Sequence, residues 1–266
     1  MKETIGILGC GWLGFPLAQS LVEKGYRVKG TSTTVDKCVQ LTAHGIDAFH
    51  IAINENDITG DWDNFVNGLD QLLINIPPRL RKDGTASYVS KVELLLKNLP
   101  KNQRIKIIWV SSTSVFSDFQ ETITDQTVPQ PDTESGKELV RAEECIQNSG
   151  FPFTIVRFGG LIGKDRHPIK YLSGRKNNER PDAPVNLIEL YDCISILEEC
   201  IHREAINQSI NAVYPEHPSR KAYYVDAAQS RNLPLPEFDE TDRRSGKCIH
   251  PDYLLENWKY IFQVRP

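Results

Sequence analysis

Short apolar runs rich in β-branched residues alternate with amphipathic segments through the first 160 residues. The runs, each of which predicts a strand, lie at 4–8, 26–30, 48–53, 72–76, 105–110 and 153–157. The segments between them whose apolar residues recur every three or four positions, and which predict helices, lie at 15–24, 37–44, 86–98 and 136–149. This alternation indicates an α/β fold, a doubly wound parallel sheet with helices on both faces.

The pattern loosens after Arg157. A strand at 186–190, a helix at 191–202 and a strand at 210–213 are still predicted, and the polar, proline-punctuated residues 117–133 predict a surface loop. With no repeat and no flexible linker, we expect a single Rossmann-like domain over 1–266, with a small substrate-side C-terminal cap formed from about 158–185 and 214–266.

Charge and composition exclude several classes of function. The 31 basic and 35 acidic residues nearly cancel without a basic patch, which argues against a nucleic-acid partner. No apolar window approaches the roughly 20 residues of a membrane span, and the N-terminus lacks a signal peptide, so we expect a cytoplasmic monomer or homodimer. Six cysteines and six histidines show no metal-ligand spacing, so no metal site is predicted.

A glycine-rich loop follows the first predicted strand and opens the first helix: Gly9-Cys10-Gly11-Trp12-Leu13-Gly14. Gly9 suits a tight turn, Gly11 leaves room for a pyrophosphate, and Gly14 lets helix and strand pack closely. The helix N-terminus then offers free N–H groups to the phosphates. We therefore predict a dinucleotide site that includes Trp12 and Leu13, against the alternative of a glycine turn without a ligand.

The end of the second strand decides the cofactor. NAD sites normally carry an acid there, whereas this chain has Thr31, Ser32 and Thr33, with no acid before Asp36. These hydroxyls and Lys37 suit a 2′-phosphate, so we predict NADP, with NAD as the alternative. The same hydroxyls also suit a helix N-cap, and both roles remain open. The missing acid also disfavours a methyltransferase.

Three longer segments carry a family resemblance: the glycine loop, Ile107–Phe116 and Thr154–Gly163. Through them, with Pro184–Ile188, Asp192 and His217–Arg220, nearly the whole chain resembles the atypical extended branch of the short-chain dehydrogenase/reductase superfamily. It is similar to the NAD-dependent epimerase/dehydratases and in particular to the YeeZ-like proteins.

The resemblance implies a cofactor lying across the carboxyl ends of the strands. Ile76 and Pro77, with Pro78, would line it, Ser111 would contact it, and Phe158 would pass beside the nicotinamide. Ser112 would take the place of the catalytic Ser/Thr that holds the substrate oxygen. The residues alone support an alternative equally well, in which Ser111 and Ser112 cap the loop by hydrogen bonding to nearby backbone.

The chain departs from the family at its catalytic Tyr-x-x-x-Lys. Alignment places Ser135 at the tyrosine and Leu139 at the lysine, and the motif occurs nowhere else in the chain. Two functions therefore stay open: an NADP-linked oxidoreductase or epimerase-like enzyme acting on a small carbonyl, hydroxyl or sugar-type substrate, and a non-catalytic NADP-binding module, a redox sensor or scaffold, that has lost the Tyr/Lys pair.

Three further side chains have hypothetical roles. Arg220 and Tyr223 are candidates for binding an acidic group of the substrate. Arg157, at the end of a β-rich run, is expected to hold backbone carbonyls or a carboxylate. Cys10 lies inside the phosphate loop, where we expect an inert, small side chain.

Overall fold

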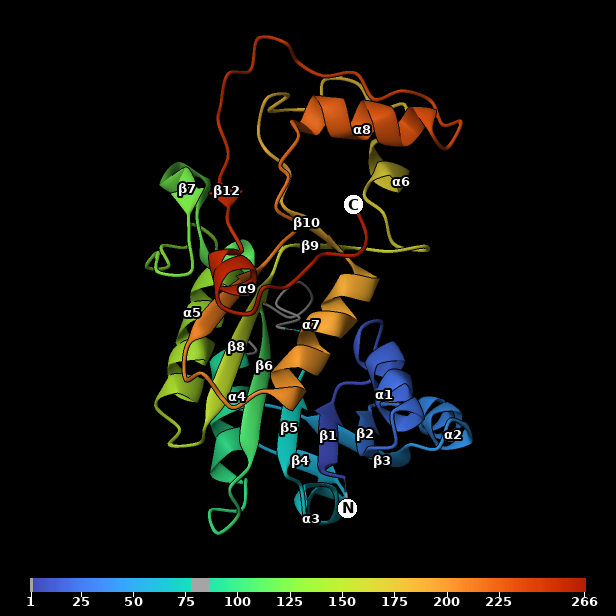
Figure 1. Ribbon diagram of the computed structural model, residues 1–266, viewed down its shortest axis with the longest axis vertical. Coiled ribbons are helices and arrows are strands. Elements are labelled where there is room, and N and C mark those ends of the chain that lie inside the picture. The colour runs from blue at the N-terminus through green and yellow to red at the C-terminus, as the bar shows by residue number, and fades with distance from the viewer. Residues whose placement is uncertain (1, 78–86) are drawn as a thin grey trace. The chain divides into compact units, whose positions relative to one another are not determined.

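An eight-stranded sheet organises the fold (Figure 1), in a computed structural model that describes residues 2–77 and 87–266. Its strands are β1 (Thr4–Leu8), β2 (Arg27–Ser32), β3 (Asp47–Ile53), β4 (Ile58–Gly60), β5 (Gln71–Ile74), β6 (Lys106–Ser112), β8 (Phe153–Phe158) and β11 (Ser209–Ala212). They lie in the order β11-β8-β6-β5-β1-β2-β3-β4. The pairs β1–β2, β1–β5, β2–β3 and β5–β6 are parallel, and β3–β4 is antiparallel.

The strand order reverses direction at β1. The chain moves outward from β1 to β2 and β3, then returns to pair β5 on the other side of β1. At such a switch point two connections leave in opposite directions, and the crevice between them binds ligands in doubly wound sheets. The glycine loop follows β1 at this point, which confirms the predicted α/β class and places the loop at the carboxyl edge.

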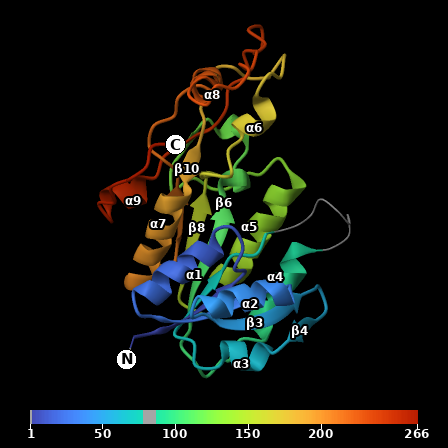
Figure 2. The same cartoon turned by 90° about the vertical axis from the view of Figure 1, so that its right-hand side faces the viewer.

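Helices cover both faces of the sheet (Figure 2). One layer holds α1 (Gly14–Glu23), α2 (Val35–Ala43) and α7 (Leu190–His202), and the other holds α3 (Trp62–Val66), α4 (Tyr88–Lys97) and α5 (Glu134–Gln147). In the first layer Ser20 Oγ donates to Glu198 Oε1 at 2.6 Å. In the second, Glu138 Oε2 accepts from the N–H of Tyr88 at 2.9 Å and so caps α4. Because β1, β5 and β6 lie between these layers, each has a run of buried apolar residues.

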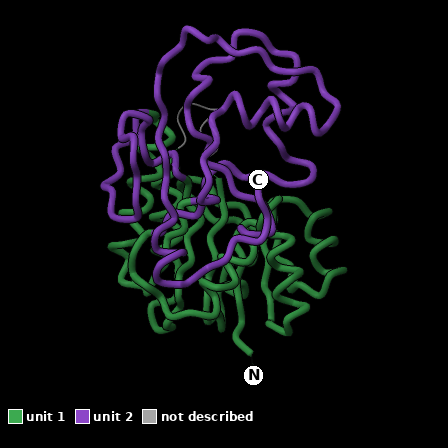
Figure 3. Tube along the Cα trace, turned by 45° about the horizontal axis from the view of Figure 1, so that its top comes forward, with its two compact units in different colours: residues 1–112, 133–157, 194–209 green, residues 113–132, 158–193, 210–266 purple. Residues whose placement is uncertain are grey.

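The chain divides into two compact units, coloured separately in Figure 3. The first holds residues 1–112, 133–157 and 194–209, and the second holds 113–132, 158–193 and 210–266. Both segments expected to form the cap lie in the second unit, together with 113–132 and parts of the chain around β10 and β11.

The second unit has short elements and a core of its own. Its elements are η1 (Thr113–Val115), η2 (Asp118–Gln120), β7 (Thr122–Ile123), β9 (Gly160–Ile162), α6 (Ile169–Leu172), β10 (Leu187–Glu189), α8 (Arg220–Gln229), β12 (Cys248–Ile249) and α9 (Asp252–Glu256). Strands β9 and β10 pair in parallel, as do β7 and β12. Its core residues are Ile162, Ile169, Val185, Leu187, Tyr224, Ala227 and Ala228.

Most of the elements missed by sequence reasoning are short, although the ten-residue helix α8 was also not predicted, nor were β12 and α9. The pattern did not predict β4, α3, β9 or α6, and residues 117–133, predicted to be a loop, contain η2 and β7. Segments of two to five residues are too short to show a period, and their structure depends on distant partners such as β12 for β7. Pro78 and Ala86, the predicted start of a helix, lie outside the described residues.

Residues 2–77 and 87–266 contain no helix with both the length and the apolar character to cross a bilayer. In the same two ranges no cluster of His, Cys, Asp or Glu has the geometry to hold a metal ion. All six cysteines are free thiols.

Candidate dinucleotide site

The glycine loop makes a tight turn directly after β1. Gly9 has φ +103°, and a Cβ there would lie 2.5 Å from the carbonyl oxygen of Asn75. The N–H of Gly11 donates to the Gly9 carbonyl at 2.9 Å, which closes the turn. Only glycine meets both the backbone angle and the close approach, so Gly9 has the role that its spacing predicts.

Gly11 and Gly14 differ sharply in their surroundings. A Cβ on Gly14 would lie 2.3 Å from the Gly9 carbonyl oxygen, because α1 begins hard against the loop. A Cβ on exposed Gly11 would meet no described protein atom within 4 Å. Packing among residues 2–77 and 87–266 therefore gives no reason for glycine at position 11. Open space beside a helix N-terminus fits a pyrophosphate that approaches the backbone.

Two side chains hold this loop from behind. Thr31 Oγ1 accepts from the N–H of Gly9 at 3.0 Å, and the Thr31 carbonyl accepts from Cys10 N–H at 3.0 Å. Asn75 Nδ2 donates to the Gly9 carbonyl at 3.2 Å. Thr31 is 2% exposed, so its hydroxyl faces the loop and not a 2′-phosphate. Sequence reasoning missed Asn75, whose only signal was its place directly after β5.

Ser32, Thr33 and Lys37 lie on the accessible side of the end of β2. Thr33 is exposed, and Ser32 Oγ accepts from the N–H of Thr34 at 3.2 Å. Thr34 is the N-cap of α2, but its side chain makes no capping hydrogen bond among the described residues, so the structure does not support the capping alternative. The ammonium of Lys37 lies 4.0 Å from the centre of the Phe15 ring and acts on the Cys10 thiol through its charge. A positive charge thus lies beside the first turn of α1. Such a charge would stabilise an anionic group of a ligand bound there.

Cys10 and Leu13 point away from solvent. Both are buried, and burial raises the pKa of the Cys10 thiol to about 12, which keeps it protonated and unreactive. Leu13 is a core residue, so any cofactor contact at 13 would come from its backbone, while Trp12 is half-buried.

A buried ionic cluster lies under the end of β6. Arg157 Nη2 donates to Glu143 Oε2 at 2.6 Å and its Nε to Glu143 Oε1 at 3.1 Å. Ser111 Oγ donates to Glu143 Oε1 at 2.6 Å. All three residues are at least 95% buried. Arg157 thus holds a carboxylate, as expected, and the Ser111 hydroxyl is engaged with Glu143 and not directed at a cofactor.

Ser112, the last residue of β6, is half-buried. On α5, Thr133 caps the helix by accepting from Gly136 N–H at 3.1 Å, and Ser135 lies half-buried in the first turn. Leu139 is 4% exposed and shares a helix face with Glu143, one turn further on. The position that the resemblance aligns with the family lysine is therefore part of the apolar core.

Ile76 and Pro77 follow β5 at the carboxyl edge of the sheet. The Ile76 carbonyl accepts from the hydroxyl of buried Tyr88 at 2.8 Å, so the backbone here is fixed by α4. Pro77 is exposed.

The remaining predicted residues belong to the second unit. Phe158 is buried at the end of β8. His167 Nδ1 accepts from Ile169 N–H, so its Nε2 carries the proton and donates to the Tyr223 hydroxyl at 2.9 Å. Burial lowers the pKa of His167 to about 4. The Arg220 guanidinium lies 5.7 Å from the Tyr224 ring centre, and its buried Nε has no hydrogen-bond partner in the described parts of the chain.

Comparison with known proteins identifies this arrangement. Residues 4–125 match the NAD binding domain of 6-phosphogluconate dehydrogenase. Protein YeeZ of Escherichia coli K12 is 33% identical over 267 residues, covering 98% of this chain and 96% of that protein. The match confirms the resemblance that the motifs predicted.

Solved structures show the same fold at low identity. A UDP-N-acetylglucosamine 4-epimerase from Bacillus cereus has TM-score 0.77 at 13% identity, covering 99% of this chain and 92% of that one. A short-chain dehydrogenase/reductase superfamily protein from Agrobacterium tumefaciens with bound NAD has TM-score 0.77 at 17% identity, covering 99% and 93%. The fold is therefore the Rossmann fold of the NAD-binding epimerases and reductases.

Proposed function

The chain belongs to the YeeZ family, and we propose that it is an NADP-binding oxidoreductase or epimerase-like protein that acts on a small carbonyl, hydroxyl or sugar-type substrate. The observation that carries the proposal is the open space at Gly11 between two glycines that the protein does need for packing. Ser32, Thr33 and Lys37 at an acid-free strand end favour NADP over NAD.

The chain's own groups have distinct proposed roles. The N–H groups that open α1 bind the pyrophosphate, and Thr31 and Asn75 hold the loop that presents them. Ile76, Pro77 and Phe158 line the cofactor. Ser112 donates a hydrogen bond to the substrate oxygen, and Arg220 and Tyr223 bind an acidic substrate group. Bound nicotinamide would supply or accept the hydride.

The sharpest test is Gly11→Val. Because no described protein atom lies within 4 Å of its Cβ position, the variant should unfold at the wild-type temperature. Its side chain should nevertheless occupy the space for the pyrophosphate and abolish NADPH binding by calorimetry. The matched variant Gly14→Ala should instead lower the unfolding temperature, because its Cβ meets the Gly9 carbonyl at 2.3 Å. Wild-type NADPH affinity in Gly11→Val would refute the site.

Calorimetry also tests the cofactor. A charge-assisted contact to the 2′-phosphate contributes about 1.5–3 kcal/mol, which is tenfold or more in affinity for NADPH over NADH. Lys37→Gln should reduce that preference. Equal wild-type affinities for the two cofactors would exclude NADP selectivity while leaving dinucleotide binding in place.

A non-catalytic NADP-binding module is the second candidate, and the buried Leu139 favours it. With a core leucine and Ser135 at the family's catalytic positions, α5 carries no tuned phenol for proton transfer. Hydride transfer from bound NADPH to small ketones, aldehydes or nucleotide sugars, followed by absorbance, separates the two candidates. We place either one in the cytoplasm, where six free thiols remain reduced.

A further inference from the structure

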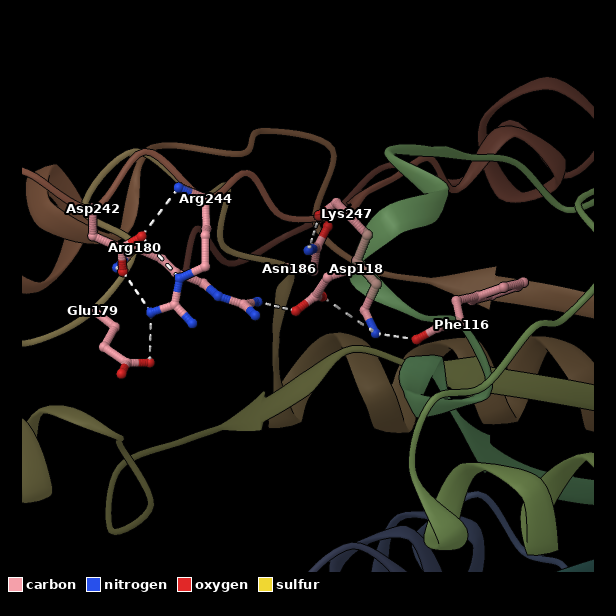
Figure 4. Close-up of polar contacts among 8 residues, drawn as sticks. All are labelled: Phe116, Asp118, Glu179, Arg180, Asn186, Asp242, Arg244 and Lys247. Carbon is pink, nitrogen blue, oxygen red and sulfur yellow. Dashed lines mark hydrogen bonds and ion pairs between the residues drawn. The ribbon is translucent and has the colours of Figure 1, made fainter.

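A network of ionic and polar contacts in the second unit brings together three segments that are far apart in sequence (Figure 4). They are residues 116–118 at the start of η2, the loop that contains Arg180, and the stretch from Asp242 to Lys247. Arg244 has two carboxylates, with Nη2 at 2.7 Å from Asp242 and 3.0 Å from Glu179. Arg180 and Lys247, by contrast, share one carboxylate, that of Asp118. Arg180 and Lys247 are therefore paired with the same carboxylate, and Asp132 also acts on Lys247 through its charge.

The two cations reach Asp118 on opposite oxygens. Arg180 Nη1 forms an ion pair with Oδ2, and Lys247 Nζ lies 3.9 Å from Oδ1. Lys247 Nζ also donates to the Phe116 carbonyl at 2.5 Å. Its side chain is only 18% exposed, so the ammonium has lost most of its water, and within the described ranges its contacts are the Phe116 carbonyl and the more distant Asp118 carboxylate. Burial accordingly lowers the pKa of Lys247, against the charges of Asp118 and Asp132.

The backbone under both cations is fixed in advance. Asn186 Nδ2 donates to the Lys247 carbonyl at 2.7 Å, and Asn186 Oδ1 accepts from Ile249 N–H at 2.9 Å. Arg180 has φ +54°, a costly angle for a non-glycine residue, and its N–H donates to Asp242 Oδ2 at 2.9 Å. Strain and preorganisation of this kind are typical of binding positions.

We propose that Arg180 and Lys247 form an oxyanion-binding site for the phosphate or carboxylate of a small ligand, and that the Asp118 carboxylate takes that group's place in this structure. The guanidinium fork binds two oxygens of the anion, and the Lys247 ammonium binds a third or neutralises the charge. A more highly charged oxyanion displaces Asp118, whose side chain is 39% exposed and free to turn outward. Anion binding by Arg180 and Lys247 does not depend on the proposed function. The statement that the bound anion is part of the substrate does rest on that function.

Calorimetric titration with inorganic phosphate and with malonate tests the site. Asp118→Asn removes the competing charge and should bind the preferred anion roughly three- to tenfold more tightly than wild type. Arg180→Gln and Lys247→Gln should each weaken binding about tenfold, and Lys247→Arg should retain it. Lys221→Gln, which removes an exposed cation paired with Glu240, is the matched control and should bind as wild type does.

Each titration is repeated with NADPH present, so that phosphate bound at the glycine loop is subtracted. Failure of NADPH to bind would count against the proposed function alone, because the part of the binding that depends on Arg180 and Lys247 is measured without it. If phosphate binds more tightly than malonate, the ligand carries a phosphate group. If malonate binds more tightly, the ligand carries a carboxylate. The proposal is overturned if neither anion binds Asp118→Asn, if Asp118→Asn binds no more tightly than wild type, or if Arg180→Gln and Lys247→Gln bind as tightly as wild type. Asp118 would then be a structural brace.

Discussion

Removing the charge of Glu143 should destabilise the protein strongly. Glu143 and Arg157 are 2% and 4% exposed, and the carboxylate is the partner of both the Arg157 guanidinium and the Ser111 hydroxyl. In Glu143→Gln the side chain keeps its size, but the buried Arg157 guanidinium loses the carboxylate that it contacts at 2.6 Å. Breaking a buried pair on one side costs about 3–5 kcal/mol. For a chain of this size that is a fall of roughly 6–20 °C in unfolding temperature.

Thermal unfolding followed by circular dichroism measures this effect, with two comparisons. Glu143→Leu combined with Arg157→Met replaces both charges by apolar groups and should recover most of the loss, because no charge is left unpaired. Glu134→Gln removes an exposed carboxylate of the same helix, paired with Lys137, and should leave the unfolding temperature unchanged. The ion pair does not hold β8 and α5 to the end of β6 if Glu143→Gln has the wild-type unfolding temperature. The same conclusion follows if the double variant unfolds at a lower temperature than Glu143→Gln.

Three further predictions concern the loop, the chemistry and pH. Thr31→Val removes the acceptor for Gly9 N–H and should weaken NADPH binding about tenfold by calorimetry, whereas an unchanged affinity would show that the loop needs no such support. Ser112→Ala should abolish any NADPH turnover. The double variant Ser135→Tyr with Leu139→Lys should raise turnover, since general acid–base catalysis contributes ~10²–10⁴ in rate. Fast wild-type turnover that persists in Ser112→Ala would place the chemistry elsewhere. Because burial lowers the folded pKa of His167 from 6.5 to about 4, the unfolded chain binds the proton more readily, so stability should fall as pH drops from 6.5 towards 4. His167→Phe should flatten that slope, and an identical slope in the variant would contradict the assignment.

Long periodic segments allowed most of the fold to be predicted. The strands β1, β6 and β8 and the helices α1, α5 and α7 were placed within a few residues, because each buries several apolar residues in a regular pattern. Strand β3 was placed as well, although Ile51 is its only buried residue. Short elements such as β4 and β7 have too few residues to show a repeating hydrophobic pattern. They form because another strand supplies hydrogen-bond partners, a neighbouring one for β4 and a distant one, β12, for β7.

The sequence by itself determined the strand, glycine loop and helix of the candidate dinucleotide site. Backbone constraints there act between near neighbours: the φ of Gly9 and the contact between Gly14 and Gly9 depend on six consecutive residues. Tertiary structure alone decided which polar side chains pair with one another. Thr31 turns inward to Gly9, Ser111 is bound to Glu143 32 positions later, and Asp118 lies between Arg180 and Lys247. Such pairings are fixed by how strands and helices pack, because a buried polar group must find a partner wherever the fold brings one.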